Sequence, residues 1–195
     1  MGLKRRRYGS LGSLVRRHLS LEEDDRTTLL SRKLRAAKVR GYLTQDELAA
    51  VCRWKSARAI QHIRANNHHR VRAATAAAMA TSSERRRLEA LLQLKGVSVP
   101  MASAVLMLLY PKRYGVIDIR VWQLLYAVGA VSEKRGGTNF SAKNWLEFLV
   151  ILRRLSSKLG VTARAVERTM FDMHKANQKD RLYESVGALP AKRGR

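Results

Sequence analysis

Residues 94–100, which read LKGVSVP, form a candidate turn for binding a phosphate group. The glycine lets the chain turn tightly between two leucine-rich runs, and a helix is expected to begin near Met101. The first backbone N–H groups of that helix have no partner within it, and they lie at the positive end of the helix dipole, which favours an anion. Lys95 adds a full charge, and the turn has no acidic residue. The alternative is an ordinary turn between two helices whose N–H groups bind water.

Few other side chains have a spacing that suits catalysis or metal binding. Asp118 stands just before an apolar run with helical periodicity, and aspartate is a favoured N-cap residue, so capping is one role for its carboxylate. His68 and His69 are adjacent and point in different directions, which makes them a poor pair of metal ligands. Cys52 is the only cysteine, so the chain can build neither an internal disulfide nor a four-cysteine iron–sulfur cluster. We expect no catalytic metal and no iron–sulfur cofactor.

The charge of the chain indicates the class of its partner. Among 195 residues, 39 are Lys or Arg and 15 are Asp or Glu, which gives a net charge of +24. Such an excess attracts a polyanion, and nucleic acid is favoured over an anionic membrane surface because the apolar faces are typical of a core. The chain has no run of 18 apolar residues, and no long apolar stretch follows the basic start MGLKRRR. We expect a cytoplasmic (nucleoid-associated) or nuclear protein that is neither secreted nor membrane-bound.

The elements that must position these residues are predicted to be helical throughout. No alternating strand pattern longer than a few residues occurs, and 46% of the residues are hydrophobic, which is enough for a core. We expect about eight helices in one domain at 26–176, with a helical hairpin at 84–110 whose second helix is apolar on almost every side. The charged segment 1–25 is expected to be loosely ordered, and 177–195 to be a flexible basic tail.

Capping residues mark several of the expected helix ends. Thr44 and Glu47 in TQDE have the spacing of a capping box, which predicts a helix start. Ser141 is placed to begin a long helix rich in large apolar residues, and Gly160 is placed to end it.

The stretch LLQLKGVSVPMASAVLMLLYPKRYGVIDIRVW, from Leu91 to Trp122, resembles the helix-hairpin-helix (HhH-GPD) DNA glycosylase superfamily. Members carry a hairpin of the form L-P-G-V-G, then a helix that contains alanine, then a short loop that ends in V-D-x-x-V. The matching residues here are Leu94, Lys95, Gly96, Val97, Ser98, Ala102, Ile117, Asp118 and Val121. Asp118 follows Ser98 by 20 residues, which suits the pattern. The match covers about one sixth of the chain.

The resemblance implies an all-α, glycosylase-like bundle that binds double-stranded DNA through the hairpin. In the superfamily this hairpin grips the phosphate backbone beside the damaged nucleotide, often with a bound monovalent cation. Carried over to this chain, the residues of the grip are Lys95, Gly96, Val97, Ser98 and Val99. Ser98 stands where the pattern has its second glycine, and a serine is disfavoured there if the position needs a positive φ.

The resemblance also implies where the chemistry takes place. Asp118 matches the aspartate at the mouth of the base pocket, where a carboxylate stabilises the positive charge that grows on the sugar and helps to activate water. Pro100 matches the lysine of lyase-competent members, and proline cannot form a Schiff base, so a monofunctional enzyme that uses water is expected. Trp54, Lys55 and Trp122 are candidates for lining the base pocket, although aromatic residues at helical spacing are more often part of a core.

Two main hypotheses follow from the sequence. The first is a monomeric base-excision repair glycosylase that flips a damaged or modified base out of DNA and hydrolyses its N-glycosidic bond, with Asp118 central. The second is a non-catalytic protein that grips DNA with the same fold, in which Ser98 and Pro100 mark departures from the catalytic pattern. The sequence NNHH at 66–69 is either a wedge that fills the space left by the base or an ordinary turn.

Overall fold

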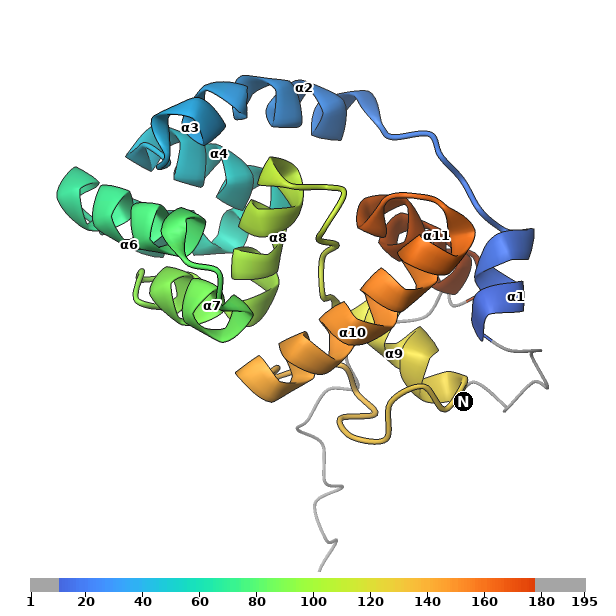
Figure 1. Ribbon diagram of the computed structural model, residues 1–195. Coiled ribbons are helices and arrows are strands. Elements are labelled where there is room, and N and C mark those ends of the chain that lie inside the picture. The colour runs from blue at the N-terminus through green and yellow to red at the C-terminus, as the bar shows by residue number, and fades with distance from the viewer. Residues whose placement is uncertain (1–10, 178–195) are drawn as a thin grey trace, which may run out of the picture.

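The computed structural model describes residues 11–177, and every regular element in that range is helical (Figure 1). The prediction of an all-α fold is confirmed for this part of the chain. In chain order the elements are α1 (Leu11–Arg17), α2 (Asp25–Lys33), α3 (Arg35–Arg40), α4 (Gln45–Ser56), the 3-10 helix η1 (Ala57–Ala59), α5 (Ile60–Arg64), α6 (His68–Ala80), α7 (Glu84–Leu92), α8 (Val99–Leu109), α9 (Ile119–Ala127), α10 (Ala142–Leu159) and α11 (Ala163–Asn177). The expected number of about eight is too low, because helices as short as α3 and α5 show no hydrophobic period.

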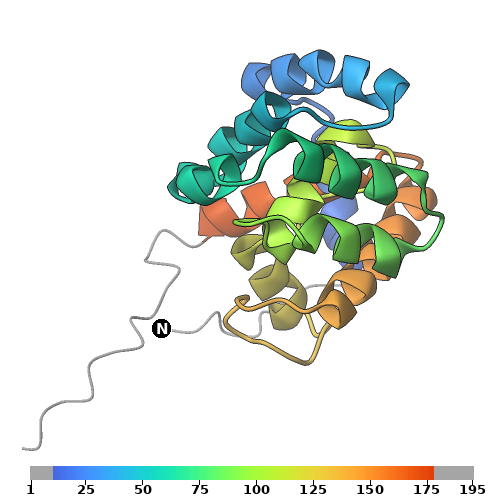
Figure 2. The same ribbon diagram turned by 90° about the vertical axis from the view of Figure 1, so that its left-hand side faces the viewer.

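The helices form two groups, which a non-helical link at residues 110–118 joins (Figure 1). Helices α2 to α8 make up the first group, and α9, α10 and α11 make up the second. Helix α1 packs against α11, so the second group combines both ends of the described chain. In the view of Figure 2, α6 and α7 of the first group face the viewer. The link therefore runs from one group to the other, and Asp118 is its last residue.

Helix α8 is the centre of the first group. It packs against α2, α4 and α7, and all its residues from 101 to 109 are buried, as its apolar sequence predicted. Each large apolar side chain buried in this way contributes about 1.5–3 kcal/mol relative to an exposed one. The hairpin turn precedes this helix and the link follows it, so both are attached to the most deeply buried element of the group.

The predicted helix ends are confirmed where capping residues marked them. The side chain of Thr44 accepts a hydrogen bond from the backbone of Glu47, and the side chain of Glu47 accepts one from the backbone of Thr44, which completes a capping box. Ser141 begins α10 with a second such box, and Gly160 ends that helix at a φ of 68°. A left-handed residue at a helix end suits glycine because glycine has no Cβ to clash there.

The expectation that residues 1–25 are loosely ordered is wrong for residues 11–25. Helix α1 buries Leu14 and Val15, and the Glu23 carboxylate binds the guanidinium groups of Arg164 and Arg168 on α11 at 2.7 Å and 2.8 Å. One turn of buried residues is too short to show a period, and these ion pairs join residues more than 140 positions apart. Residues 1–10 and 178–195, with nearly all of the predicted basic tail, lie outside the described residues.

Candidate functional site

The turn between α7 and α8, here called the hairpin turn (residues 93–98), has the form that the sequence suggested. Val97 and Val99 point inward and are 7% and 6% exposed, whereas Lys95 and Ser98 are exposed. Gly96 has a φ of 79°, and Ser98 has a φ of −89°. Ser98 therefore adopts ordinary extended backbone, and a serine at this position is not strained.

A buried asparagine clamps the hairpin turn. The side-chain oxygen of Asn66 accepts a hydrogen bond of 2.8 Å from the backbone N–H of Lys95, and its amide nitrogen donates one of 2.9 Å to the Lys95 carbonyl. The same nitrogen donates to the Ile63 carbonyl at 2.9 Å. Asn66 is 1% exposed, so its side chain serves the turn, and Asn67 caps α6, whereas His68 and His69 are exposed.

The hairpin turn lies tightly against the segment that follows α4. A Cβ atom added to Gly96 would lie 2.8 Å from the Cβ of His62 and 3.2 Å from the backbone nitrogen of Ile63. Only glycine allows so close an approach. Arg70 also donates a hydrogen bond of 2.9 Å to the carbonyl of Gln93, which brings a second cation beside Lys95. The turn is thus held by η1, α5 and the start of α6, within a few residues of the end of α4.

Asp118 lies where the link meets α9. Its Oδ1 accepts a hydrogen bond of 2.8 Å from the backbone N–H of Arg120, which is the expected N-cap. Its Oδ2 lies 3.0 Å from the ammonium nitrogen of Lys55, near the end of α4. The two side chains are 18% and 19% exposed, so both are accessible from solvent while each holds the other in place. The ion pair joins residues 63 positions apart in the sequence.

Helix α11 supplies two titratable groups behind this pair. Complete burial raises the pKa of the Glu167 carboxyl; Arg164, at 2.5 Å, opposes the rise, and the charge of Asp118 adds to it. Burial lowers the pKa of His174, and the charge of Arg120, whose Nη1 lies 3.4 Å from His174 Nδ1, lowers it further. We refer to Lys55, Asp118, Arg120, Glu167 and His174 as the Asp118 corner.

The link that carries Asp118 is fixed from both sides. On the inner side, the Ser103 hydroxyl accepts a hydrogen bond of 3.1 Å from the backbone of Ile117, and Gly115 lies directly against Glu167. On the outer side, the Tyr114 hydroxyl donates one of 2.9 Å to Glu84 on α7, which also binds Arg153 of α10 at 2.6 Å. These contacts fix the link between the two helix groups.

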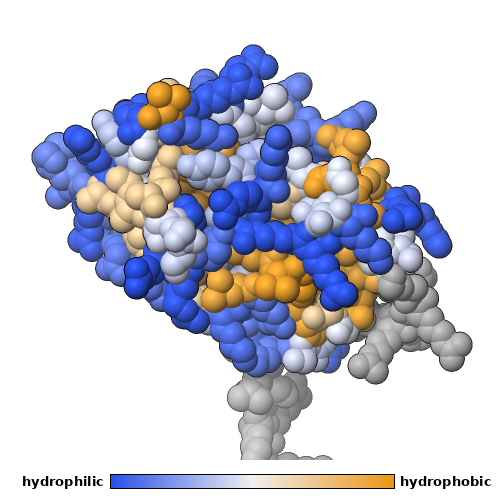
Figure 3. All heavy atoms as spheres, viewed as in Figure 1, coloured by the Kyte–Doolittle hydropathy of each residue, from blue (hydrophilic) through white to orange (hydrophobic). Residues whose placement is uncertain are grey.

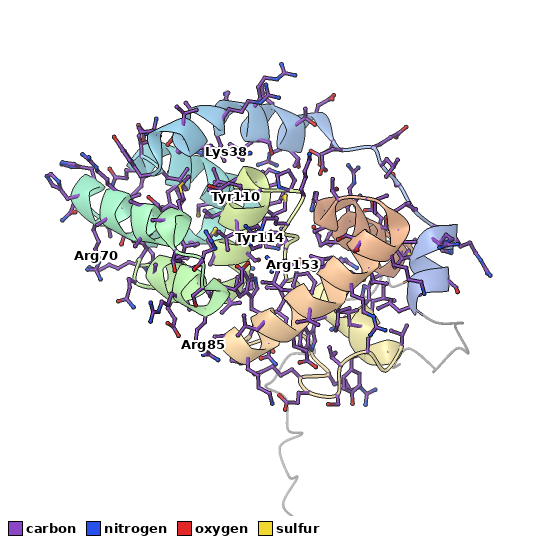
Figure 4. All side chains as sticks on the ribbon, viewed as in Figure 1. Lys38, Arg70, Arg85, Tyr110, Tyr114 and Arg153 are labelled. Carbon is purple, nitrogen blue, oxygen red and sulfur yellow. The ribbon has the colours of Figure 1, made fainter. Side chains whose placement is uncertain are left out.

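Cations and aromatic rings follow the link on the face shown in Figure 4. Lys38, Tyr110, Tyr114 and Arg153 lie in a row there. The Lys38 ammonium is 5.2 Å from the Tyr110 ring, and the Arg153 guanidinium is 5.1 Å from the Tyr114 ring. Hydrophilic residues cover most of this face (Figure 3). The row joins α3, the link and α10 through cation–π contacts.

The three residues suggested for a base pocket do not form one group. Trp122 is fully buried; its ring meets Phe140 edge-on, and its N–H donates to the carbonyl of Glu133 at 3.1 Å. Trp54 is half-buried and donates a hydrogen bond of 2.9 Å to the hydroxyl of Thr27 on α2. Of the three side chains, that of Lys55 binds the Asp118 carboxylate, whereas Trp122 meets Asp118 through the helical hydrogen bond from its backbone N–H to the Asp118 carbonyl. The indole of Trp122 belongs to the core, which is the commoner role for an aromatic residue at helical spacing.

A hollow of about 370 Å³ opens between α2, the end of α8 and the start of α11. Its lining includes Arg32, Arg35 and Lys38 from the first helix group and Arg164 and Arg168 from the second. Neither Asp118 nor Lys55 lines it. A base that reaches Asp118 would therefore enter by a different path from this hollow.

Within residues 11–177 no group of three or more His, Cys, Asp or Glu side chains is arranged to hold a metal ion. None of the helices described in that range is long and apolar enough to cross a membrane. Comparisons of the chain with protein-family models, with curated proteins and with solved structures gave no significant match.

Proposed function

We propose that this protein is a DNA glycosylase that takes a damaged or modified base out of the duplex and hydrolyses its N-glycosidic bond. The observation that chiefly supports the proposal is the placement of Asp118. A carboxylate with two fixed hydrogen-bond partners ends a rigid link and remains partly exposed. The helix that supplies its partner Lys55 leads directly into the segment against which the hairpin turn packs.

The hairpin turn supports the DNA-binding part of the proposal. Its exposed backbone, with Lys95 and Arg70 beside it, suits the phosphate backbone of a duplex, which gives affinity without sequence choice. The net charge of +24 adds a general attraction. Binding is then steeply salt-dependent, because each neutralised phosphate releases counterions. In this proposal the protein acts as a monomer, and it works in a nucleoid or a nucleus.

The Asp118 corner supports the chemical part. As the glycosidic bond breaks, positive charge grows on the sugar, and a fixed carboxylate stabilises that charge more in the transition state than in the ground state. The N-cap hydrogen bond from the Arg120 backbone and the Lys55 ion pair orient the Asp118 carboxylate before substrate arrives. Asp118 is thus the residue on which hydrolysis depends in this proposal.

The test is base excision from duplexes that each carry one lesion: an oxidised, an alkylated, a deaminated or a mismatched base. Hot alkali then reveals abasic sites. Asp118→Asn keeps the helix cap, since asparagine caps as well as aspartate, but it removes the negative charge. We expect the variant to lose about a hundredfold or more of the excision rate. Asp24→Asn, at the N-cap of α2, is the matched control and should excise the base as the wild type does.

One observation favours the non-catalytic alternative. Both carboxylate oxygens of Asp118 are already engaged, one by the cap and the other by Lys55, as in a purely structural residue. That alternative predicts no product from any of the duplexes, together with salt-sensitive binding that Asp118→Asn leaves unchanged. Excision that survives in Asp118→Asn would contradict the assignment of Asp118 and leave the glycosylase activity to another residue.

A further inference from the structure

We propose that Lys55 is a nucleophile that forms a Schiff base with the abasic sugar and gives the protein a DNA strand-cleaving lyase activity. The inference rests on the proposed function, because Lys55 meets a sugar aldehyde only if DNA presents its lesion at Asp118. It changes the expectation of a purely hydrolytic enzyme. That expectation followed from Pro100, but Lys55 comes from α4, a helix to which the sequence pattern assigned no such role.

The geometry that points to Lys55 is its contact with Asp118. The Lys55 nitrogen lies 3.0 Å from Asp118 Oδ2, and its side chain is 19% exposed, so it is neither sealed in the core nor freely mobile in solvent. A group that stabilises the glycosidic bond as it breaks must lie beside C1′ of the sugar. An amine in hydrogen-bond contact with that group is therefore close to the same carbon.

The position of the hairpin turn supports the same assignment. Gly96 packs against His62 and Ile63, and a Cβ added to Gly96 would also lie 3.4 Å from the carbonyl oxygen of Ala59, four residues after Lys55. Phosphates held at this turn therefore lie against a segment that begins only four residues after Lys55 in the chain.

The chemistry balances with the two residues of the pair. Asp118 takes a proton from the Lys55 ammonium, and the neutral amine attacks C1′ of the ring-opened sugar, whose carbonyl becomes a hydroxyl. Asp118 returns the proton as this hydroxyl leaves as water, and a C=N bond forms. The regenerated carboxylate then takes a proton from C2′, a C2′=C3′ double bond forms, and the C3′–O bond to the phosphate breaks. Water hydrolyses the C=N bond and releases Lys55, so no oxidant or reductant is needed.

Other lysines are less well placed for this step. Lys95 lies on the exposed rim of the hairpin turn, where it suits a phosphate contact. Lys143 also forms an ion pair with a carboxylate, Glu133 at 2.8 Å, but that pair is exposed, with side chains 72% and 51% accessible, and lies at the start of α10. Lys143 is therefore a matched control: it is a lysine–carboxylate pair of similar length that belongs to no candidate site.

The test is borohydride trapping on a duplex with a preformed abasic site, which needs no prior base excision. Hydride reduces the C=N bond and leaves a covalent protein–DNA adduct, and digestion with mass spectrometry locates the modified lysine. Lys55→Arg keeps the positive charge beside Asp118 but cannot form the adduct; Lys55→Gln is a second variant, and thermal unfolding checks both folds. We expect an adduct at Lys55 in the wild type and in Lys143→Arg, and its loss in both Lys55 variants.

The other outcomes separate this inference from the proposed function. An adduct that persists in both folded Lys55 variants, or that maps to another amine, overturns the assignment of Lys55. No adduct in the wild type, together with excision of a base from a lesion duplex, overturns the inference and leaves a hydrolytic glycosylase. The absence of both adduct and excision overturns the inference and the proposed function together.

Discussion

The hairpin turn and the Asp118 corner are joined by one short segment, residues 55–63, but they are held in place by different means. The turn is held mainly by uncharged groups, namely a glycine, two inward valines and the amide group of one buried asparagine, with one further hydrogen bond from Arg70. The corner is held by ion pairs and by titratable groups from α4, α9 and α11. A site that grips phosphate needs fixed backbone. A site that stabilises developing charge needs charged groups, and in the Asp118 corner these groups come from several helices.

The largest effect is expected from the packing that fixes the link. In Gly115→Ala the new Cβ would lie 2.5 Å from the Cβ of Glu167 and 3.0 Å from a methyl carbon of Leu152, so α11 or the link must shift. We expect a loss of about 3 kcal/mol in the free energy of unfolding, measured in urea. Gly136→Ala, where the nearest atom is 4.0 Å away, should change it by less than about 0.5 kcal/mol. Equal stability of the two variants would mean that α11 does not fix the link.

A smaller effect is expected at the hairpin turn. Asn66→Ala leaves the backbone N–H and carbonyl of Lys95 without their partner and should cost about 2 kcal/mol. Hydrogen exchange at the Lys95 amide should become faster, and duplex affinity should fall. Asn67→Ala removes only the N-cap of α6 and should cost about 1 kcal/mol, with exchange at Lys95 unchanged. If both variants increased the exchange rate of the Lys95 amide equally, the protection of this amide would not depend on Asn66 in particular.

The smallest effect is a pH dependence that belongs to the corner alone. Burial lowers the pKa of His174 below its ordinary value of 6.5, and Arg120 lowers it further, so below pH 6.5 the unfolded chain binds a proton that the folded chain resists. The contribution of neutral His174 to the free energy of unfolding is therefore fully present above pH 6.5. It falls as the pH decreases from there, by at most about 1.4 kcal/mol per pH unit. Urea titrations from pH 7.5 to about pH 5.5 measure this slope.

The matched variants for this slope are histidines in the two regions. His174→Gln should flatten it, whereas His62→Gln, an exposed residue beside the hairpin turn, should leave it as in the wild type. A slope that vanished in His62→Gln would move the pH dependence from the corner to the turn.

Much of the fold follows from local patterns. The capping boxes at Thr44 and Ser141, the cap at Asp118 and the apolar second helix of the hairpin are all found where the sequence predicts them. Each of these features involves residues within about four positions of one another, so the physical cause is present in a short window of sequence. The sequence does not predict helix α1, because that helix packs against α11 and no local pattern reveals this contact.

The candidate site divides in the same way. The orientation of Val97 and Val99 could be predicted, because a turn between two buried helices needs apolar anchors. The clamp by Asn66 and the partnership of Lys55 with Asp118 could not, because they join residues 29 and 63 positions apart. Trp122 is a candidate for the base pocket by its sequence but lies in the core. Periodicity shows which residues share a helix face, and not which element packs against that face.

An all-α fold and a strong positive charge can be predicted from the sequence, together with a glycine turn before an apolar helix and an aspartate that caps the helix after the link. These properties depend on composition and on neighbours along the chain. The binding of Asp118 by a lysine from α4, and the burial of Glu167 and His174 of α11 behind it, come from tertiary contacts. Charged groups act on one another through space at a few ångströms, and folding, not sequence separation, sets those distances.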